Sequence, residues 1–186
     1  MPVRMLTDGE KALLRPIFGT TLPYDDQYIA TNDEKYGGEN NSITLAIVPH
    51  MAVNKWALDY SSSSNLNTWT FIHEMTHVWY WYHGGSNMRS GIWTWVTHSN
   101  YGDAYFYDLS ESASLKDYNF EAQCSIVADY WYVSRGLSPR HNNGRNRTLA
   151  AYQPFIMQVQ GSGAPAPQGN KDFAEHWGST SKYRPL

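Results

Sequence analysis

The sequence predicts an α+β domain in which two central helices pack with a small β-sheet. Two long runs carry apolar residues three and four apart, the spacing of a buried helix face, and short β-branched runs precede them. The chain has 186 residues, of which 41% are hydrophobic and 17% charged, and this suits one globular domain with a sizeable core. The apolar faces of the two helices are therefore expected to meet in that core.

The first elements are predicted from caps and breakers. Thr7 and Glu10 have the spacing of a capping box, in which two side chains satisfy backbone amides at the start of a helix, and Gly19 ends that helix. Pro49 ends a β-branched run. The elements expected before the central motif are a helix over 8–18, strands at 27–31 and 42–48, a turn at 37–41 and an irregular polar segment at 54–64.

The strongest helix signal covers residues 67–82, which contain no glycine or proline. Polar side chains that can cap a helix precede it, and Gly84 follows it as a stop signal. Its apolar positions are Leu66, Phe71, Ile72, Met75, Val78 and Trp79. This helix is expected to carry the pattern His-Glu-x-x-His.

His73 and His77 lie four residues apart, so a helix places them one above the other on the same face. Two imidazoles at this spacing can bind one Zn²⁺ ion. Glu74 lies about 100° round the helix from His73, beside the metal and not on it. From there it can act as the general base of a zinc peptidase. So short a pattern also arises by chance, but the helical flanks argue against chance here.

A catalytic zinc ion takes three protein ligands, so a third is expected. His83 stands six residues after His77, but Tyr80 occupies the position where the three-histidine pattern has a helix-ending glycine. If the helix continues, His83 points about 240° away from His77, and we interpret it as a helix-end residue. Glu121 is the better candidate, although the dipole of its helix alone also favours a glutamate in the first turn.

The second helix follows Asn119 or Asp117, either of which can cap it, and Gly136 can close it. Cys124 falls on its apolar face, where a buried inert thiol is the commoner case, although a cysteine there can also line a metal pocket. The later elements expected are strands at 92–97 and 104–109, a polar loop at 138–144, a helix over 147–159 kinked or split by Pro154, and a Gly/Pro-rich linker at 161–167.

Composition excludes some classes of partner. A net charge of −3 and a pI near 6.1 give no electrostatic footprint for nucleic acid or for an anionic membrane. A single cysteine excludes an intrachain disulfide and fits a fold completed in a reducing cytosol. No apolar run reaches 18 residues and the N-terminus lacks a signal-peptide pattern, so export is expected to depend on another machine or a fused partner.

The motifs FIHEMTHVW and YNFEAQCSIVADYW, with the opening LTDGE, resemble a metallopeptidase domain family fused to the C-terminus of VgrG-type spike proteins of bacterial type VI secretion. The resemblance covers about residues 5–160. It implies a zincin-like fold of the glutamate-ligand type, with His73, His77 and Glu121 on Zn²⁺ and Glu74 as general base. It also implies an antibacterial effector that is secreted by the type VI system and acts in the periplasm of the target cell.

The resemblance divides the chain into a zincin-like metallopeptidase domain over 1–160 and a linker and tail over 161–186. It implies three partners: a peptide or protein substrate, the rest of the spike as a fused domain, and a cognate immunity protein. The alternative is a non-catalytic binding module or pseudoenzyme in which zinc is structural. A structural site would close the fourth zinc position with protein, and an intact Glu74 favours the enzyme.

Two roles around the site stay open in the sequence. A tetrahedral oxyanion needs one donor besides zinc, and the candidates are Tyr118, His98 and His141, each of which is more often structural. Asp129 lies eight residues after Glu121 and could orient a ligand histidine from behind its ring, or have a surface or ion-pair role.

Overall fold

A computed structural model describes residues 3–32, 40–45, 47–87, 90–91, 100–109 and 114–161. It confirms a mixed α+β architecture with a small four-stranded sheet. The main elements are β1 (Val3–Met5), α1 (Asp8–Phe18), β2 (Tyr28–Asn32), β3 (Ile43–Leu45), β4 (Val48–Ala52), α2 (Asn65–Tyr82), α4 (Phe120–Ser134) and α5 (Leu149–Gln160). Short 3₁₀ helices cover Val53–Lys55, Tyr60–Ser62, Tyr101–Tyr105 and Leu115–Asp117.

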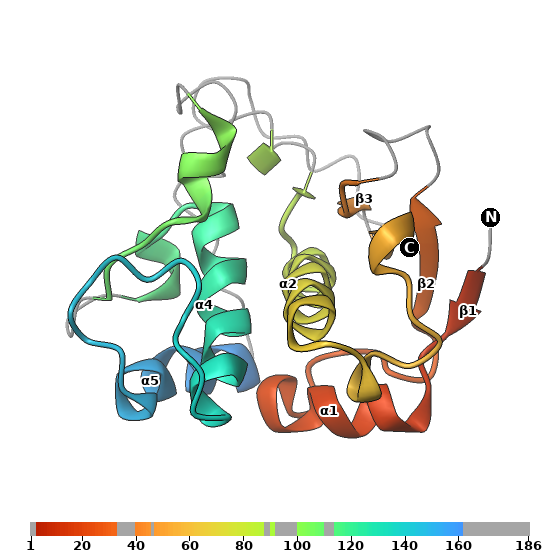
Figure 1. Cartoon of the computed structure of the whole chain (residues 1–186), viewed down its shortest axis with the longest axis horizontal. Helices are drawn as coiled ribbons and strands as arrows, with labels where there is room; N and C mark the ends of the chain where they lie inside the picture. The colour runs from red at the N-terminus through yellow and green to blue at the C-terminus, as the bar shows by residue number, and fades with distance from the viewer. Residues whose placement is uncertain are drawn as a thin grey trace.

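Helix α2 is the centre of the domain. Figure 1 shows it with the sheet on one side, α4 on the other and α1 below, while α5 lies under α4. Because neighbours surround it, every residue from Thr68 to Tyr80 is buried, including the polar ones. Ser64 caps it by accepting a hydrogen bond from Asn67 N, and Gly84, with φ of 89°, follows its end. The predicted central helix is therefore confirmed, but its burial is all-round and not confined to one face.

The sheet has the order β1-β2-β4-β3, with β2 and β4 parallel and the other two pairs antiparallel. The predicted strand at 27–31 is confirmed with a shift of one residue. The predicted strand at 42–48 is wrong in extent, because β3 and β4 form a hairpin within that region and Pro49 lies inside β4. Apolar residues continue through the turn, so nothing in the pattern marked the reversal.

The capping box of α1 is confirmed, since Thr7 Oγ1 accepts from Glu10 N and Glu10 Oε2 accepts from Thr7 N. Glu10 also binds Arg4 through both carboxylate oxygens and accepts from the backbone N–H of Tyr60, just before α2. A buried carboxylate needs such partners. Glu10 thereby ties α1 to the edge of the sheet and to the entry of the central helix.

Three further predictions were tested in the second half of the chain. The helix capped by Asn119 is confirmed as α4, and Gly136 follows it with φ of 74°. The expected strand at 104–109 is wrong, because Ala104 and Tyr105 end a 3₁₀ helix, although Tyr107 forms one isolated bridge with Asn142. The final helix is confirmed as α5, a single helix with Pro154 inside it.

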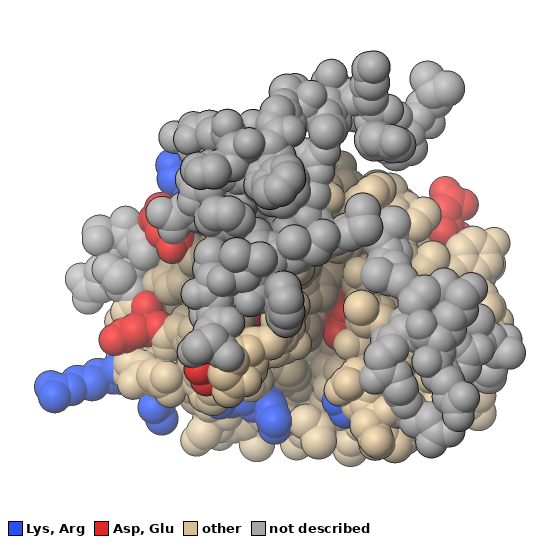
Figure 2. Space-filling view, turned by 90° about the horizontal axis from the view of Figure 1, so that it is seen from above, with Lys and Arg blue, Asp and Glu red and all other residues tan. Residues whose placement is uncertain are grey.

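Other predictions fall outside the described residues. These are most of the turn at 37–41, the strand at 92–97, and the linker and tail beyond residue 161. Among the described helices none is long and apolar enough to cross a bilayer. Figure 2 shows lysine and arginine side chains at separate places on the described part of one face, with acidic side chains between them.

Candidate metal centre

The two histidines of α2 and a glutamate of α4 converge in the core between the helices. Glu121 Oε2 lies 3.0 Å from His73 Nε2 and 3.4 Å from His77 Nε2. All three residues are buried, at 3–4% exposure. The packing of α2 against α4 therefore brings together the three residues that the sequence proposed as ligands. One oxygen of Glu121 faces the same ring nitrogen of both histidines.

Aromatic rings fix both imidazoles. His73 stacks against Trp69 and Tyr105, with centroid distances of 5.2 and 5.4 Å, and both rings are tilted 28° from its plane. His77 packs against Phe120, with a centroid distance of 4.2 Å. Such contacts limit rotation of the histidine rings about their side-chain bonds. The arrangement is one that holds ligands in place before a metal arrives.

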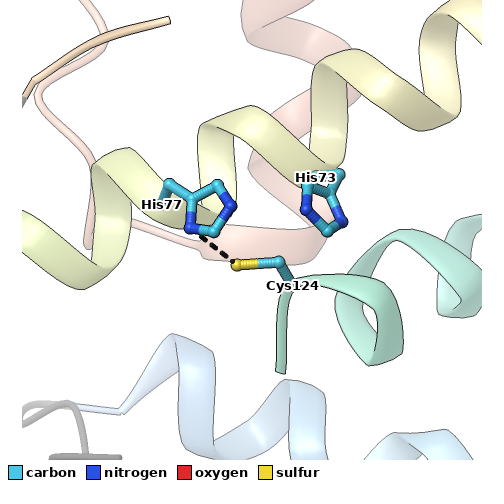
Figure 3. Close-up of side chains that lie close together, drawn as sticks. All are labelled: His73, His77 and Cys124. Atoms are coloured by element: carbon cyan, nitrogen blue, oxygen red, sulfur yellow. Dashed lines mark hydrogen bonds between the residues drawn. The ribbon is translucent and has the colours of Figure 1, made fainter. Parts of the chain in front are cut away.

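Cys124 occupies the other side of His77. Its Sγ lies 3.2 Å from His77 Nδ1, and Figure 3 shows it reaching from α4 towards the His77 ring. His73, His77 and Cys124 each present one ligand atom, and these atoms lie within 4.8 Å of one another. The structure thus offers a His/His/Cys group as a possible metal site beside the His/His/Glu group. Cys124 therefore lies beside His77 in this candidate site, as the sequence suggested, and its thiol is buried.

The electrostatics of this cluster follow from burial and charge. Burial lowers the pKa of His77, but Cys124 and then the Glu121 carboxylate outweigh it and raise that pKa well above the ordinary histidine value. Burial raises the pKa of Cys124 to about 11, so it is a neutral thiol at pH 7 and we assign the effect on His77 to Glu121. Burial also raises the pKa of Glu121, but His77 and His73 hold it well below the ordinary value. The cluster keeps a charged carboxylate in the core.

Glu74 lies on α2 beside the histidines, where the sequence placed it, and is 5% exposed. The hydroxyl of Thr44, from β3, donates to Glu74 Oε2 at 2.7 Å. No described residue donates a hydrogen bond to the other oxygen, Oε1. Sequence analysis missed Thr44, because no local motif links a threonine to a carboxylate 30 positions away.

The second oxygen of Glu121 is held by Tyr101, whose hydroxyl donates to Oε1 at 2.5 Å. Burial and the nearby Glu121 charge raise the pKa of Tyr101 far above the tyrosine value, so its hydroxyl stays a donor. Since Oε1 is occupied, Oε2 alone faces the histidines. Sequence analysis missed Tyr101 too, since it stands in a 3₁₀ helix that carried no recognisable pattern.

We expect Tyr101→Phe to weaken the binding of a metal ion to this candidate site by about 10- to 100-fold, the usual effect of removing a group that orients a metal ligand. The ring remains, so folding should change little. Competition with a fluorescent zinc chelator measures the affinity. Tyr130→Phe serves as a matched control, because no hydrogen bond from its hydroxyl to the cluster is present in the described structure. Equal affinities of the two variants and the wild type would show that Tyr101 does not orient Glu121.

Asp129 is fully buried and does not orient a histidine directly. Its Oδ1 accepts from Trp69 Nε1 and Arg140 N, and its Oδ2 accepts from Tyr107 Oη and His141 N. Trp69 stacks on His73, so Asp129 supports the site indirectly, through its hydrogen bond to Trp69. The alternative prediction of a surface or ion-pair role is wrong, since backbone N–H groups, an indole and a tyrosine hydroxyl satisfy this carboxylate in the core.

Of the other residues that the sequence singled out, His141 lies near the candidate metal site. His141 packs on Trp69 and Tyr105, the two rings that stack on His73, and burial lowers its pKa to about 4. His83 ends α2 and lies 3.2 Å from the carbonyl oxygen of Thr21, which confirms it as a helix-end residue. Tyr118 donates to the carbonyl of Asp108. His98 lies outside the described residues.

Comparisons with known proteins relate the chain to a type VI secretion spike protein. No protein-family model matches the chain. The chain is 31% identical over 148 residues to the type VI secretion system spike protein VgrG2b of Pseudomonas aeruginosa. This alignment covers 76% of this chain and 14% of that protein. It is also similar to the solved structure of the effector domain of P. aeruginosa VgrG2b, with a TM-score of 0.66 and 27% identity, covering 81% of this chain and 79% of that one.

Both comparisons lead to the same protein, VgrG2b. The sequence match spans 14% of that spike protein, and the structural match is to its effector domain. The chain therefore covers a small part of the length of this relative. In sequence and in fold, this chain is homologous to the effector domain of VgrG2b, a type VI secretion spike protein.

Proposed function

We propose that this domain is a zinc-dependent peptidase that a type VI secretion spike delivers and that acts in the periplasm of a target bacterium. The observation that carries the proposal is the position of Glu121 Oε2, 3.0 and 3.4 Å from the Nε2 atoms of His73 and His77. Glu74 follows His73 directly and lies beside this cluster. The homology to an effector domain supports delivery to another cell.

The residues present fit zinc. Two imidazole nitrogens and a carboxylate oxygen are a donor set that catalytic zinc sites use, and three protein ligands leave one position for water. A charged carboxylate in the core needs a cation or several donors, and the two histidines face it from one side. His73, His77 and Glu121 would hold the ion. When bound, zinc makes its water more acidic and polarises the carbonyl of the scissile bond.

The chain's own groups then divide the work. Glu74 accepts a proton at Oε1, because Thr44 already occupies Oε2, and it can return that proton to the leaving amine. Tyr101 keeps the second oxygen of Glu121 away from the metal position. Tyr105 stacks on His73, and no described residue accepts a hydrogen bond from its hydroxyl. That hydroxyl is therefore available to donate to a substrate.

An extended peptide is the substrate that the sheet suits best. β3 is the last strand on its side of the sheet in the described residues, and it lies next to the helix that carries Glu74. An edge strand can pair with an extended chain through backbone hydrogen bonds, which accept any sequence. This supports hydrolysis of a peptide or protein, with the remaining spike and an immunity protein as further partners of the effector.

The alternative is a non-catalytic binding module with a structural metal, and the position of Cys124 favours it. If Cys124 joined the two histidines and Glu121, protein would fill all four zinc positions, as in structural sites. However, Cys124 lies at Nδ1 of His77 and Glu121 lies at Nε2, on opposite sides of one ring. One imidazole cannot present both nitrogens to one ion, so an ion at Nδ1 of His77, beside Cys124, and an ion at Nε2, beside Glu121, are different sites.

Removal and return of the metal test the proposal. The purified domain is expected to hold about one Zn²⁺ per chain and to cleave an unfolded protein substrate. A strong chelator should abolish cleavage, and one equivalent of Zn²⁺ should restore it, since the ion supplies the Lewis acid. Elemental analysis and a fluorogenic peptide library report the two quantities. Zinc at one per chain with no cleavage of any library member would support the binding module instead.

A further inference from the structure

We propose that Thr44 is a positioning residue for Glu74, which fixes the general base through its hydroxyl and sets the place of the substrate through its backbone. This inference rests on the proposed function, because it concerns the glutamate that serves as base there. It links the edge of the sheet to the metal helix, two parts of the fold that are 30 residues apart in the chain.

The contact is buried and short. Thr44 Oγ1 lies 2.7 Å from Glu74 Oε2 and 3.2 Å from the carbonyl oxygen of Glu74, and Thr44 is 5% exposed. A hydroxyl has one proton to donate, and bonds to charged acceptors are the shorter and stronger kind. The donation therefore goes mainly to the carboxylate. Within the described residues this is the one side-chain hydrogen bond that Glu74 makes.

The hydrogen bond selects one orientation of the carboxylate. With Oε2 held by β3, the other oxygen has to project away from the sheet. A general base works only when its acceptor atom lies within hydrogen-bond reach of the proton it takes. A carboxylate free to rotate would spend part of its time with neither oxygen in that place. Thr44 removes this freedom, and its hydroxyl makes no hydrogen bond to His73, His77 or Glu121 in the described structure.

The backbone of Thr44 faces the side of β3 that lies away from β4. Thr44 pairs with Pro49 across the hairpin, and proline has no N–H, so the two cannot form a pair that exchanges both hydrogen bonds. Leu45 pairs with Val48, and a turn of two residues separates them. The pair that flanks such a tight turn is a hydrogen-bonded pair. Because bonded and non-bonded pairs alternate along an antiparallel hairpin, the next pair, Thr44 with Pro49, is a non-hydrogen-bonded pair. The N–H and C=O of Thr44 therefore point outward from β4.

Thr44 would thus contact both the bound peptide and the general base. An extended peptide that pairs with β3 would bond to the backbone of Thr44, while the side chain of Thr44 holds Glu74. The separation between the bound peptide and the base would then be set by the dimensions of a single residue. This accounts for a polar β-branched residue at a buried position of a short edge strand.

Replacement of the hydroxyl tests the kinetic part. Thr44→Val is expected to lower kcat about 10- to 100-fold while KM changes less than about twofold, because backbone pairing survives and the base is misplaced. Thr44→Ser keeps the hydroxyl and should stay within about threefold of wild type. The control is Thr70→Val on α2, whose hydroxyl donates to Leu66 O, and it should leave kcat unchanged. Equal kcat for Thr44→Val and wild type would overturn the proposal.

A double-mutant cycle on the zinc-free protein tests the contact without any activity. Thr44→Val and Glu74→Ala are expected to shift the urea midpoint by amounts that do not add, because each removes the same hydrogen bond. Additive shifts would mean that the hydroxyl serves the backbone carbonyl instead, and the proposal would fall. If the wild type cleaves no peptide, the proposed function fails, yet the cycle still decides whether Thr44 holds Glu74.

Discussion

Glu74→Gln is expected to reduce peptide hydrolysis by about 10² to 10⁴-fold, which corresponds to about 3–5 kcal/mol of activation free energy. The amide keeps the size of the side chain and can still accept a hydrogen bond from Thr44, so the cluster should stay in place. It cannot take a proton from water at neutral pH. Zinc content and thermal unfolding are expected to match the wild type, because Glu74 is beside the metal position and not on it.

The same variant separates an enzyme from a binding module in cells. The wild-type domain is expected to harm a bacterium when it is directed to the periplasm, and Glu74→Gln is expected to be harmless there at equal protein levels. Growth curves measure the harm that each protein causes, and immunoblots of the periplasmic and cytoplasmic fractions measure the protein levels. If both proteins are equally harmful, toxicity does not need the base, and binding explains it. If harm occurs only in the cytoplasm, the proposed site of action is wrong while the chemistry can stand.

Glu121→Ala is expected to weaken zinc binding more than about 100-fold, because groups that merely orient a ligand are already worth 10- to 100-fold. The substitution removes the oxygen that faces both Nε2 atoms, and it leaves the Tyr101 hydroxyl without its acceptor. Cys124→Ser keeps a small polar group at Nδ1 of His77, and we expect it to change the zinc affinity less than about tenfold. Both affinities follow from chelator competition at fixed pH and salt.

If Cys124→Ser weakens zinc binding more than Glu121→Ala does, the ligands are His73, His77 and Cys124. Cobalt substitution provides an independent signature, because thiolate coordination gives an intense charge-transfer band near the ultraviolet that nitrogen and oxygen ligands lack. The wild type and Cys124→Ser should therefore have the same cobalt spectrum. A band that disappears in Cys124→Ser would place the thiolate on the metal and would favour a closed, structural site.

Much of the site could be predicted from the sequence because part of its geometry is local. The four-residue spacing of His73 and His77 fixes their common face once a helix forms, and the capping residues Ser64 and Asn119 begin both helices where their side chains predict. Glu121 was placed in a first turn by the same reasoning, but its choice as a ligand over a dipole-favoured surface residue came from resemblance. Helix geometry alone could not decide that question.

The two wrong strand predictions have a common physical origin, because the local pattern of apolar residues does not show where a short strand ends or turns. The run over 42–48 remains apolar through its turn, so the prediction of a single strand there missed the reversal after β3 and the second strand, β4. The aromatic run at 104–109 has strand propensity, yet its first residues form a 3₁₀ helix that carries Tyr101 and Tyr105 to the metal cluster. Tertiary contacts with α4 outweigh the weak propensity of so short a segment.

By itself the sequence determined the helix that carries the histidines, the side of it on which Glu74 stands, and the start of the helix that carries Glu121, because each depends on contacts within four residues along the chain. Only the tertiary structure decided that Glu121 meets His73 across 48 residues, that Thr44 reaches Glu74 across 30 and that Tyr101 reaches Glu121 across 20. These contacts form when α2 is buried between the sheet and α4, and burial then requires each polar group to find a partner.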